Sequence, residues 1–301
     1  MKRKLIPFAL IILLAVFAAA CGKAQQTGAG GDNYPNAHLL VDVKWIEEHA
    51  KDPNVVIIDA RPKGYEQGHI PGAISLPYGE LKDGNTFAPK EKFTKLMQDA
   101  GVNKDSTIVV YDEGGALGAT RVFYVAEYYG LKDKVKVLNG GFLAWTVAGK
   151  DVSTDVPKPA KGSFVAEPNP NLITTKEQLM KMDIEQCTLL DTRTEGEYKG
   201  TDLRGNKKGG HLEGAVHKEW NTVFQQTADG VPLFLNYKEL KKSYEEIGLK
   251  DLKKTVVPYC QTNIRGAHSY FTLRLLGFTD IRPYEGSWAE WGNADDTKVV
   301  S

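Results

Sequence analysis

The stretch VVIIDAR (55–61) returns later in the chain as CTLLDTR (187–193), and this repetition decides the fold. Three more pairs follow in the same order: GHIPGAISLP (68–77) with GHLEGAVH (210–217), TIVVYD (107–112) with TVVPYC (255–260), and VKVLNGGFLAW (135–145) with IRPYEGSWAEW (281–291). The spacing between matching residues widens after the first pair, which places an insertion in the second copy within 198–210. The chain therefore contains two copies of one structural unit.

Each copy alternates short apolar runs with longer segments of helical spacing. The runs VVII, TIVV and VKVL are nearly continuous apolar strands, as expected for a parallel sheet covered on both faces. The segments 90–102 and 120–131 have helical spacing and end near Gly. This alternation predicts an α/β fold in which each domain is a parallel sheet with helices on both faces and right-handed crossovers.

The repeat also sets the domain boundaries. We expect the first domain over 38–150 and the second over 172–296. Between them, DVSTDVPKPAKGSFVAEPNPN (151–171) holds four Pro and is typical of an extended linker.

Composition excludes several classes of protein. The chain has 301 residues with 38 basic and 38 acidic side chains, and this zero formal charge argues against a nucleic-acid partner. Three Cys are too few for a disulfide scaffold or a zinc ribbon. The six His lie far apart, without the spacing of metal ligands. We therefore predict no metal and no organic cofactor.

The first residues, MKRKLIPFALIILLAVFAAAC (1–21), have the pattern of a secretory signal: a basic start, an apolar run and small residues before Cys21. The apolar run is shorter than the roughly 20 residues that span a membrane. Its end resembles a bacterial lipobox, which implies lipidation of Cys21 and a lipid-anchored protein on the extracytoplasmic side of a cell-envelope membrane. A plain cleaved signal and an uncleaved anchor are the alternatives. The Gly-rich, polar residues 22–37 predict a flexible tether.

Cys260 is the strongest candidate for a catalytic residue. It follows the strand pattern TVVPY, and ligands of parallel α/β sheets sit beyond the carboxyl ends of the strands. A short loop then leads into an amphipathic run near Arg265, whose free N–H groups and positive end favour a thiolate. The thiolate is the nucleophilic form, so Cys260 is predicted to be catalytic. The alternative is a buried, inert thiol. Pro258 is unusual inside this strand, because it cannot donate to the ladder.

The residues YCQTNIRGAHSYFTLRLLGF (259–278), with DTR, GHLEGA and EGSWAEW, resemble the rhodanese family. The tandem copy resembles a two-domain thiosulfate or 3-mercaptopyruvate sulfurtransferase. This resemblance implies that Cys260 takes a sulfane sulfur from a small anionic donor such as thiosulfate, as a persulfide, and passes it to a cyanide or thiol acceptor. It also implies that the first copy, where Asp112 stands in place of the Cys, is catalytically silent.

The loop after Cys260 departs from the family pattern at one position. The family commonly has Gly where this chain has Asn263, and Asn tolerates left-handed backbone angles, so we expect the loop to form. The loop is predicted to cradle the persulfide with its amides, and Arg265 to bind the donor by its planar fork. The alternative for Arg265 is a surface residue that caps the loop. The predicted substrate-binding residues of the loop are Gln261, Thr262, Asn263, Ile264 and Arg265.

Arg193, in the DTR motif, is a further candidate, because the matching Arg of two-domain relatives lies in the substrate pocket. The alternative is an ion pair with Asp191 or Glu195. Arg61 repeats the motif in the silent copy, so the motif also has a structural role.

Loop length separates two chemistries. Cys-based phosphatases that resemble this fold have five residues between Cys and Arg, whereas four separate Cys260 from Arg265 here, which favours a single transferred sulfur. Mercaptopyruvate is the alternative donor, although the cation at the end of this loop favours thiosulfate. A non-catalytic persulfide carrier or binding module of the envelope is the alternative from another class.

Overall fold

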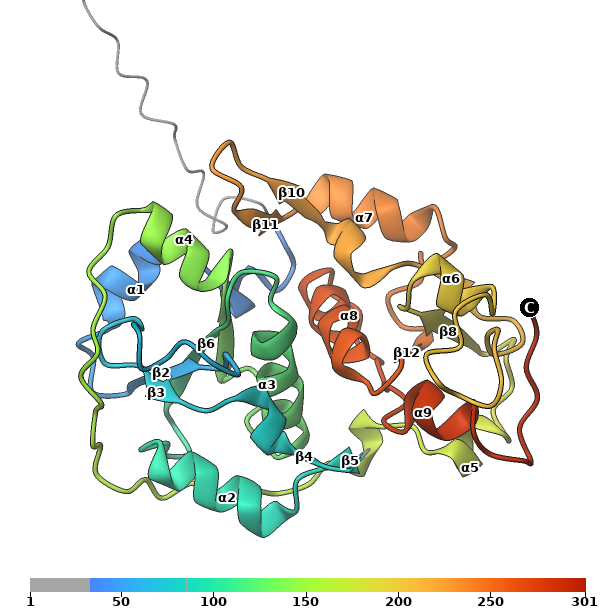
Figure 1. The fold of residues 1–301 in the computed structure, drawn as a ribbon, viewed down its shortest axis with the longest axis horizontal. Coiled ribbons are helices and arrows are strands. Elements are labelled where there is room, and N and C mark those ends of the chain that lie inside the picture. The colour runs from blue at the N-terminus through green and yellow to red at the C-terminus, as the bar shows by residue number, and fades with distance from the viewer. Residues whose placement is uncertain (1–32, 85) are drawn as a thin grey trace, which may run out of the picture.

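The computed structural model describes residues 33–84 and 86–301. Two α/β domains lie side by side, and each is built on a parallel sheet (Figure 1). This arrangement confirms the predicted fold class. The signal sequence, Cys21 and most of the predicted tether lie outside the described residues.

The first domain holds five parallel strands in the order β1-β7-β6-β2-β3. Their bounds are β1 (Leu40–Val41), β2 (Val55–Asp59), β3 (Ile74–Ser75), β6 (Thr107–Tyr111) and β7 (Val135–Leu138). The helices are α1 (Val43–His49), α2 (Lys90–Asp99), α3 (Leu117–Tyr128) and α4 (Gly141–Val147). Alternate strand residues point to opposite faces, so Ile58 packs in the cluster that includes α2 and α3, and Ile57 packs with α1 and α4. Two covered faces explain why these strands are apolar throughout.

Short elements complete the first domain. They are the 3-10 helices η2 (Ala37–Leu39) and η3 (Tyr78–Leu81) and an antiparallel hairpin of β4 (Lys82–Asp83) and β5 (Thr86–Phe87). The hairpin extends from the first domain toward the second, and ends near α5 (Figure 1).

The second domain repeats this plan with fewer regular strands. Its parallel sheet has the order β12-β8-β9, and the bridges Val256–Ile281 and Thr174–Tyr284 extend it where β7 and β1 lie in the first domain. The strands are β8 (Cys187–Asp191), β9 (Val216–His217) and β12 (Thr255–Tyr259). The helices are η4 (Pro170–Leu172), α5 (Lys176–Leu179), α6 (Glu195–Tyr198), η5 (Trp220–Val223), α7 (Tyr237–Glu245), α8 (Ile264–Leu275) and α9 (Ser287–Trp291).

Pro258 lies in β12 without leaving a neighbouring carbonyl unpaired. Arg282 N–H donates to Val256 O at 2.9 Å and Tyr284 N–H donates to Pro258 O at 3.0 Å, so Arg282 O faces the place where Pro258 lacks an N–H. The Thr174 hydroxyl donates to that carbonyl at 2.8 Å. Thr174 therefore replaces the donor that proline removes from the ladder.

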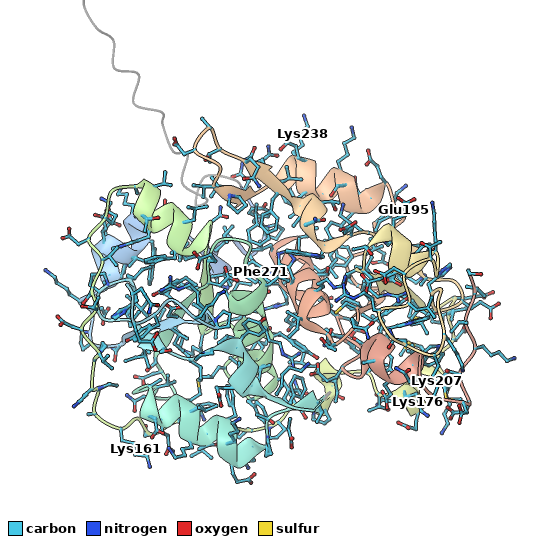
Figure 2. The ribbon with its side chains drawn as sticks, in the orientation of Figure 1. Lys161, Lys176, Glu195, Lys207, Lys238 and Phe271 are labelled. Atoms are coloured by element: carbon cyan, nitrogen blue, oxygen red, sulfur yellow. The ribbon has the colours of Figure 1, made fainter. Side chains whose placement is uncertain are left out.

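The two domains share one hydrophobic core. Helix α3 of the first domain packs against α8 of the second, with the rings of Phe123 and Phe271 4.9 Å apart and those of Tyr124 and Tyr270 5.0 Å apart. Figure 2 labels Phe271 between the two domains. A single cluster of buried residues includes strands of both sheets. The interface therefore buries apolar surface continuously from one domain to the other.

A second-domain hairpin, β10 (Phe224–Gln226) and β11 (Pro232–Phe234), lies on the first domain. Phe234 N–H donates to Asn139 Oδ1 at 3.1 Å, and Val231 is buried in the cluster that includes α1 and α4. Gly140 accommodates this contact, since a Cβ there would lie 2.6 Å from Val231. The hairpin thus covers the turn into α4 of the silent copy.

The predicted linker 151–171 is fastened to the first domain. Gly162 N–H donates to Gln98 O at 2.8 Å, Phe164 N–H donates to Val102 O at 3.1 Å, and the Phe164 ring is buried. The segment has little regular secondary structure, and these contacts hold it along its path.

The end of the predicted tether needs a correction. Tyr34 is buried and its hydroxyl donates to Leu235 O, while the Asn36 side chain donates to Arg274 O at 2.6 Å. These residues pack on the second domain, so the flexible tether does not extend to residue 37. Within 33–84 and 86–301, no helix is long and apolar enough to span a membrane.

Candidate active site

Cys260 directly follows β12 at the carboxyl edge of the second sheet. Its thiol is free, and the residue is buried, with an exposed fraction of 1%. Helix α8 begins at Ile264, one residue before the start that the sequence indicated. Cys260 therefore lies four residues before the N-terminus of α8, and contact of its sulfur with the free N–H groups of that helix stays a prediction.

The loop turns through Asn263, whose φ of 55° and ψ of 25° are left-handed. This confirms that Asn can replace the Gly of the family pattern at this position. Asn263 Nδ2 donates to the Glu285 carboxylate at 2.6 Å. A Cβ on Gly266 would lie 2.0 Å from Asn263 Oδ1, so Gly266 makes room for the folded Asn side chain.

The segment that opens α9 holds the backbone of the loop. Cys260 N–H donates to Ser287 Oγ at 3.3 Å, and Cys260 O accepts from Trp288 N–H at 2.9 Å. Gln261 O accepts from Ala289 N–H, also at 2.9 Å. Ser287 has a φ of 50°, a strained backbone of the kind that clusters at functional sites. The cysteine is therefore fixed from both sides, by α8 and by α9.

Arg265 forms a bidentate ion pair with Glu197. Its two Nη atoms donate to the carboxylate at 2.6 and 2.8 Å. Burial raises the pKa of Glu197, but the hydrogen bond and charge of Arg265 outweigh it and lower that pKa to about 2. Burial lowers the pKa of Arg265, yet the hydrogen bond to Glu197 and the charge of Cys260 raise it overall. The geometry thus places Arg265 as a cation that positions the loop, and its binding of substrate stays a prediction.

Arg193 is a buried structural cation. It donates to Asp191 at 2.5 Å and to Gly210 O at 2.6 Å, and its guanidinium lies 4.0 Å from the centre of the Trp288 ring. In the silent copy, Arg61 makes the equivalent contacts with Asp59, Gly68 O and the Phe142 ring. This symmetry favours the structural alternative for Arg193 over a place in the substrate pocket.

The remaining loop residues differ in what they contact. The amide of Gln261 exchanges two hydrogen bonds with Asn206, at 3.0 and 3.1 Å, and Asn206 belongs to the insertion at 198–210. The insertion therefore holds the side chain of Gln261 by hydrogen bonds. Substrate binding by Gln261, Thr262, Asn263 and Ile264 stays a prediction.

The first domain contributes charged residues to the loop after Cys260. Arg121 of α3 is fully buried and pairs with Glu285 at 2.5 and 3.1 Å. Its Nη1 also donates to Asn263 O at 3.4 Å. Lys82 of β4 donates to Thr262 O at 3.4 Å. The active loop is therefore built by both domains.

Asp112 fills the equivalent loop of the silent copy with its own carboxylate. That carboxylate accepts four backbone N–H groups, from Gly114, Ala116, Gly118 and Ala119, at 3.0, 3.0, 2.8 and 3.3 Å. Ala116 has a φ of 57° and precedes α3 as Asn263 precedes α8. The silent loop is one residue longer, since Ala116 is the fourth residue after Asp112. The first loop is thus an amide cradle that the Asp112 side chain fills.

Sequence reasoning missed Lys82, Arg121, Glu197 and Glu285. Arg121 stands as a charge within an apolar helical run, which is a signal that it has a buried partner. Glu197 follows Thr194 in a capping-box pattern, and the structure contains that box. Lys82 carries no comparable signal, because only the packing of the domains brings it to the loop.

Comparison with known proteins decides the family. The model of the rhodanese-like domain matches this chain twice, over residues 42–148 and 174–294. The chain belongs to the rhodanese family. Its two family domains coincide with the two sheets, and Cys260 lies within the second matched range.

Its relatives are sulfur-transfer proteins. The chain is 32% identical over 282 residues to the sulfur carrier protein TtuD of Thermus thermophilus, with 86% of this chain and 95% of that protein covered. It is also 32% identical to a thiosulfate sulfurtransferase of Corynebacterium glutamicum, with 87% and 90% covered. The crystal structure of the 3-mercaptopyruvate sulfotransferase SseA from Escherichia coli shares the fold, with a TM-score of 0.73, 24% identity, and 83% and 98% of the two chains covered. The chain is therefore a sulfurtransferase-family protein with a rhodanese fold.

Proposed function

We propose that this protein is a thiosulfate sulfurtransferase that works through a persulfide on Cys260. The observation that carries the proposal is the place of Cys260, directly after β12 and just before the N-terminus of α8, with Arg265 in the first turn of that helix. A backbone held on both sides fixes that sulfur in place.

The reaction has two balanced half-steps. The Cys260 thiolate attacks the outer sulfur of thiosulfate, a new S–S bond forms, and the S–S bond of the donor breaks with its electron pair leaving on sulfite. Cyanide or a thiolate then attacks the outer sulfur of the persulfide and restores the Cys260 thiolate. Each half-step transfers one sulfur atom without an external oxidant, and the cycle predicts ping-pong kinetics.

The chain offers a matched pair of cysteines for the test. Cys260→Ser is expected to abolish both sulfite and thiocyanate production with thiosulfate and cyanide. Cys187→Ser is expected to retain them, because Cys187 lies buried in β8 and burial raises the pKa of its thiol. Mass spectrometry of the wild type after thiosulfate treatment should find one added sulfur on Cys260. Full sulfite release by Cys260→Ser would refute the proposal.

A carrier function is the second candidate, favoured by the similarity to the sulfur carrier protein TtuD. A carrier would acquire the sulfur on Cys260 but turn over poorly with small acceptors. A panel of thiosulfate, mercaptopyruvate and p-nitrophenyl phosphate separates the candidates. Rapid thiocyanate formation from thiosulfate supports the enzyme, and faster turnover of mercaptopyruvate identifies that compound as the donor instead. Release of phosphate contradicts both candidates.

We also propose that a lipid on Cys21 anchors the protein to a membrane of the cell envelope, on its extracytoplasmic side. The basic and apolar pattern of residues 1–21 supports this. Incorporation of labelled palmitate into the wild type, and its loss in Cys21→Ala, tests the anchor. A wild-type protein without label contradicts it.

A further inference from the structure

Three cations lie around the active loop, and two of them are already neutralised. Arg265 binds the Glu197 carboxylate through two hydrogen bonds. Arg121 binds Glu285 through two more. Both carboxylates are buried, so each of these two cations already has a buried ion-pair partner.

Lys82 is different. Its ammonium donates to Thr262 O in the active loop, and among residues 33–84 and 86–301 no carboxylate lies within ion-pair distance of it. The nearby Glu285 carboxylate already accepts hydrogen bonds from the side chains of Arg121 and Asn263. Burial lowers the pKa of Lys82, and the charge of Arg121 lowers it further. The charges of Glu285 and Cys260 raise that pKa. Lys82 is therefore a partly buried cation at the loop that carries the thiol, without an ion-pair partner among the described residues.

The fold presents Lys82 at the edge between the domains. It is the first residue of β4, in the hairpin that extends from the silent domain toward the second one (Figure 1). A neighbouring pocket is lined by Thr86 of β5 and by Thr174 and Glu285 of the second domain, but not by Lys82 or Cys260.

We propose that Lys82, from the catalytically silent domain, binds the SO3 end of the anionic donor while Cys260 attacks its outer sulfur. This inference rests on the proposed function and deepens it, because it assigns donor recognition to a residue outside the active domain. As the S–S bond of thiosulfate breaks, the electron pair leaves on sulfite, and the Lys82 ammonium stabilises that leaving anion. The silent domain thus supplies part of the donor site.

The kinetic test compares Lys82→Met with wild type. Its KM for thiosulfate is expected to rise about ten-fold, equivalent to about 1.4 kcal/mol of lost binding. Discharge of the preformed persulfide by cyanide is expected to stay unchanged, since no donor is bound in that half-step. Lys82→Arg should restore most of the lost affinity, because it keeps the charge. The control is Lys92→Met, which removes a surface cation paired with Glu80 in the same domain and should leave KM unchanged.

A second donor sharpens the result. Methanethiosulfonate carries one negative charge instead of two and releases a sulfinate, so its KM should respond less to Lys82→Met than that of thiosulfate. An equal response of both donors would indicate a general structural effect and overturn the assignment.

A binding measurement separates this inference from the proposed function. Calorimetry of thiosulfate with Cys260→Ser, alone and combined with Lys82→Met, reports the donor site without turnover. About ten-fold weaker binding in the combined variant supports Lys82, and equal binding overturns the inference even if the wild type is active. Absence of persulfide formation in the wild type would instead overturn the proposed function.

Discussion

Arg265, in the first turn after the Cys260 loop, forms a buried ion pair with Glu197, and removal of this pair has a predictable cost in stability. Arg265→Ala leaves the Glu197 carboxylate buried and unpaired, which is expected to lower the free energy of unfolding by about 3–5 kcal/mol. Combining Glu197→Leu with Arg265→Leu removes both charges and should cost far less than Arg265→Ala. Urea denaturation measures the difference, and equal losses in the two proteins would contradict the role of the pair.

The same pair predicts that the free energy of unfolding decreases at acid pH. The pKa of Glu197 is about 2 in the folded protein and 4.5 in an unperturbed chain. A lowered folded pKa means that the stabilisation is fully present above about pH 4.5 and is lost as the pH falls toward 2. The stability of the wild type relative to the Glu197→Leu, Arg265→Leu protein should therefore decline within this window. A constant difference between pH 5 and 2.5 would argue against the assigned pKa.

Residue types in the loop could be predicted from sequence, whereas their partners could not. Cys260 was identifiable from its place after a strand, and Asn263 from its tolerance of left-handed angles. Arg265 was identifiable too, but its role depends on Glu197, which the fold brings from 68 residues away. A local pattern does not contain that contact, so Arg265 resembled a free substrate-binding group.

At the scale of the element, α8 carries a buried histidine at the domain interface. The ring of His268 lies 5.3, 5.3 and 5.5 Å from the rings of Trp220, Phe224 and Phe234. Burial lowers the pKa of His268 to about 3, so the folded protein keeps this side chain neutral where an unfolded chain, with a pKa near 6.5, binds a proton. The unfolded state therefore gains stability as the pH falls from 6.5 toward 3.

The lowered pKa of His268 gives the free energy of unfolding a measurable dependence on pH. Below pH 6.5, the wild type should lose about 1.4 kcal/mol of stability per pH unit relative to His268→Leu, which has no proton to bind at this site. Urea denaturation at pH 7 and pH 5 measures it. His38→Gln is the control, because His38 is exposed in η2. Identical pH dependence in the wild type and His268→Leu would show that α8 does not hold a neutral histidine.

The elements themselves were largely predictable, because each strand and helix has its own hydrophobic period. The exceptions have physical causes. The strand of Pro258 is completed by the Thr174 hydroxyl, which no propensity scale contains. The packed end of the predicted tether depends on Tyr34 meeting Leu235, a contact 201 residues apart in sequence.

For the whole molecule, the pairing of the domains brings residues of the first domain to the loop after Cys260. The cradle of the first domain is filled by Asp112, and hairpin β10–β11 covers the neighbouring turn. The first domain instead contributes Lys82 and Arg121, which donate hydrogen bonds to the loop after Cys260 in the second domain. These residues were unpredictable from sequence because a repeat reveals that two domains exist but not which faces meet.

Arg121 provides the test at this scale. Arg121→Met leaves Glu285 without its cation and removes a hydrogen bond to the loop after Cys260. The substitution is expected to lower the free energy of unfolding by about 3–5 kcal/mol. It should also reduce kcat/KM for thiosulfate, although Arg121 belongs to the first domain. Because the two domains share one core, far-UV circular dichroism, tryptophan fluorescence and activity should be lost in a single transition whose midpoint moves as a unit. Lys92→Met, at an exposed pair in the same domain, should change stability by less than about 1 kcal/mol. Two separate transitions, with only the first-domain one shifted by Arg121→Met, would mean that the buried pair does not couple the domains.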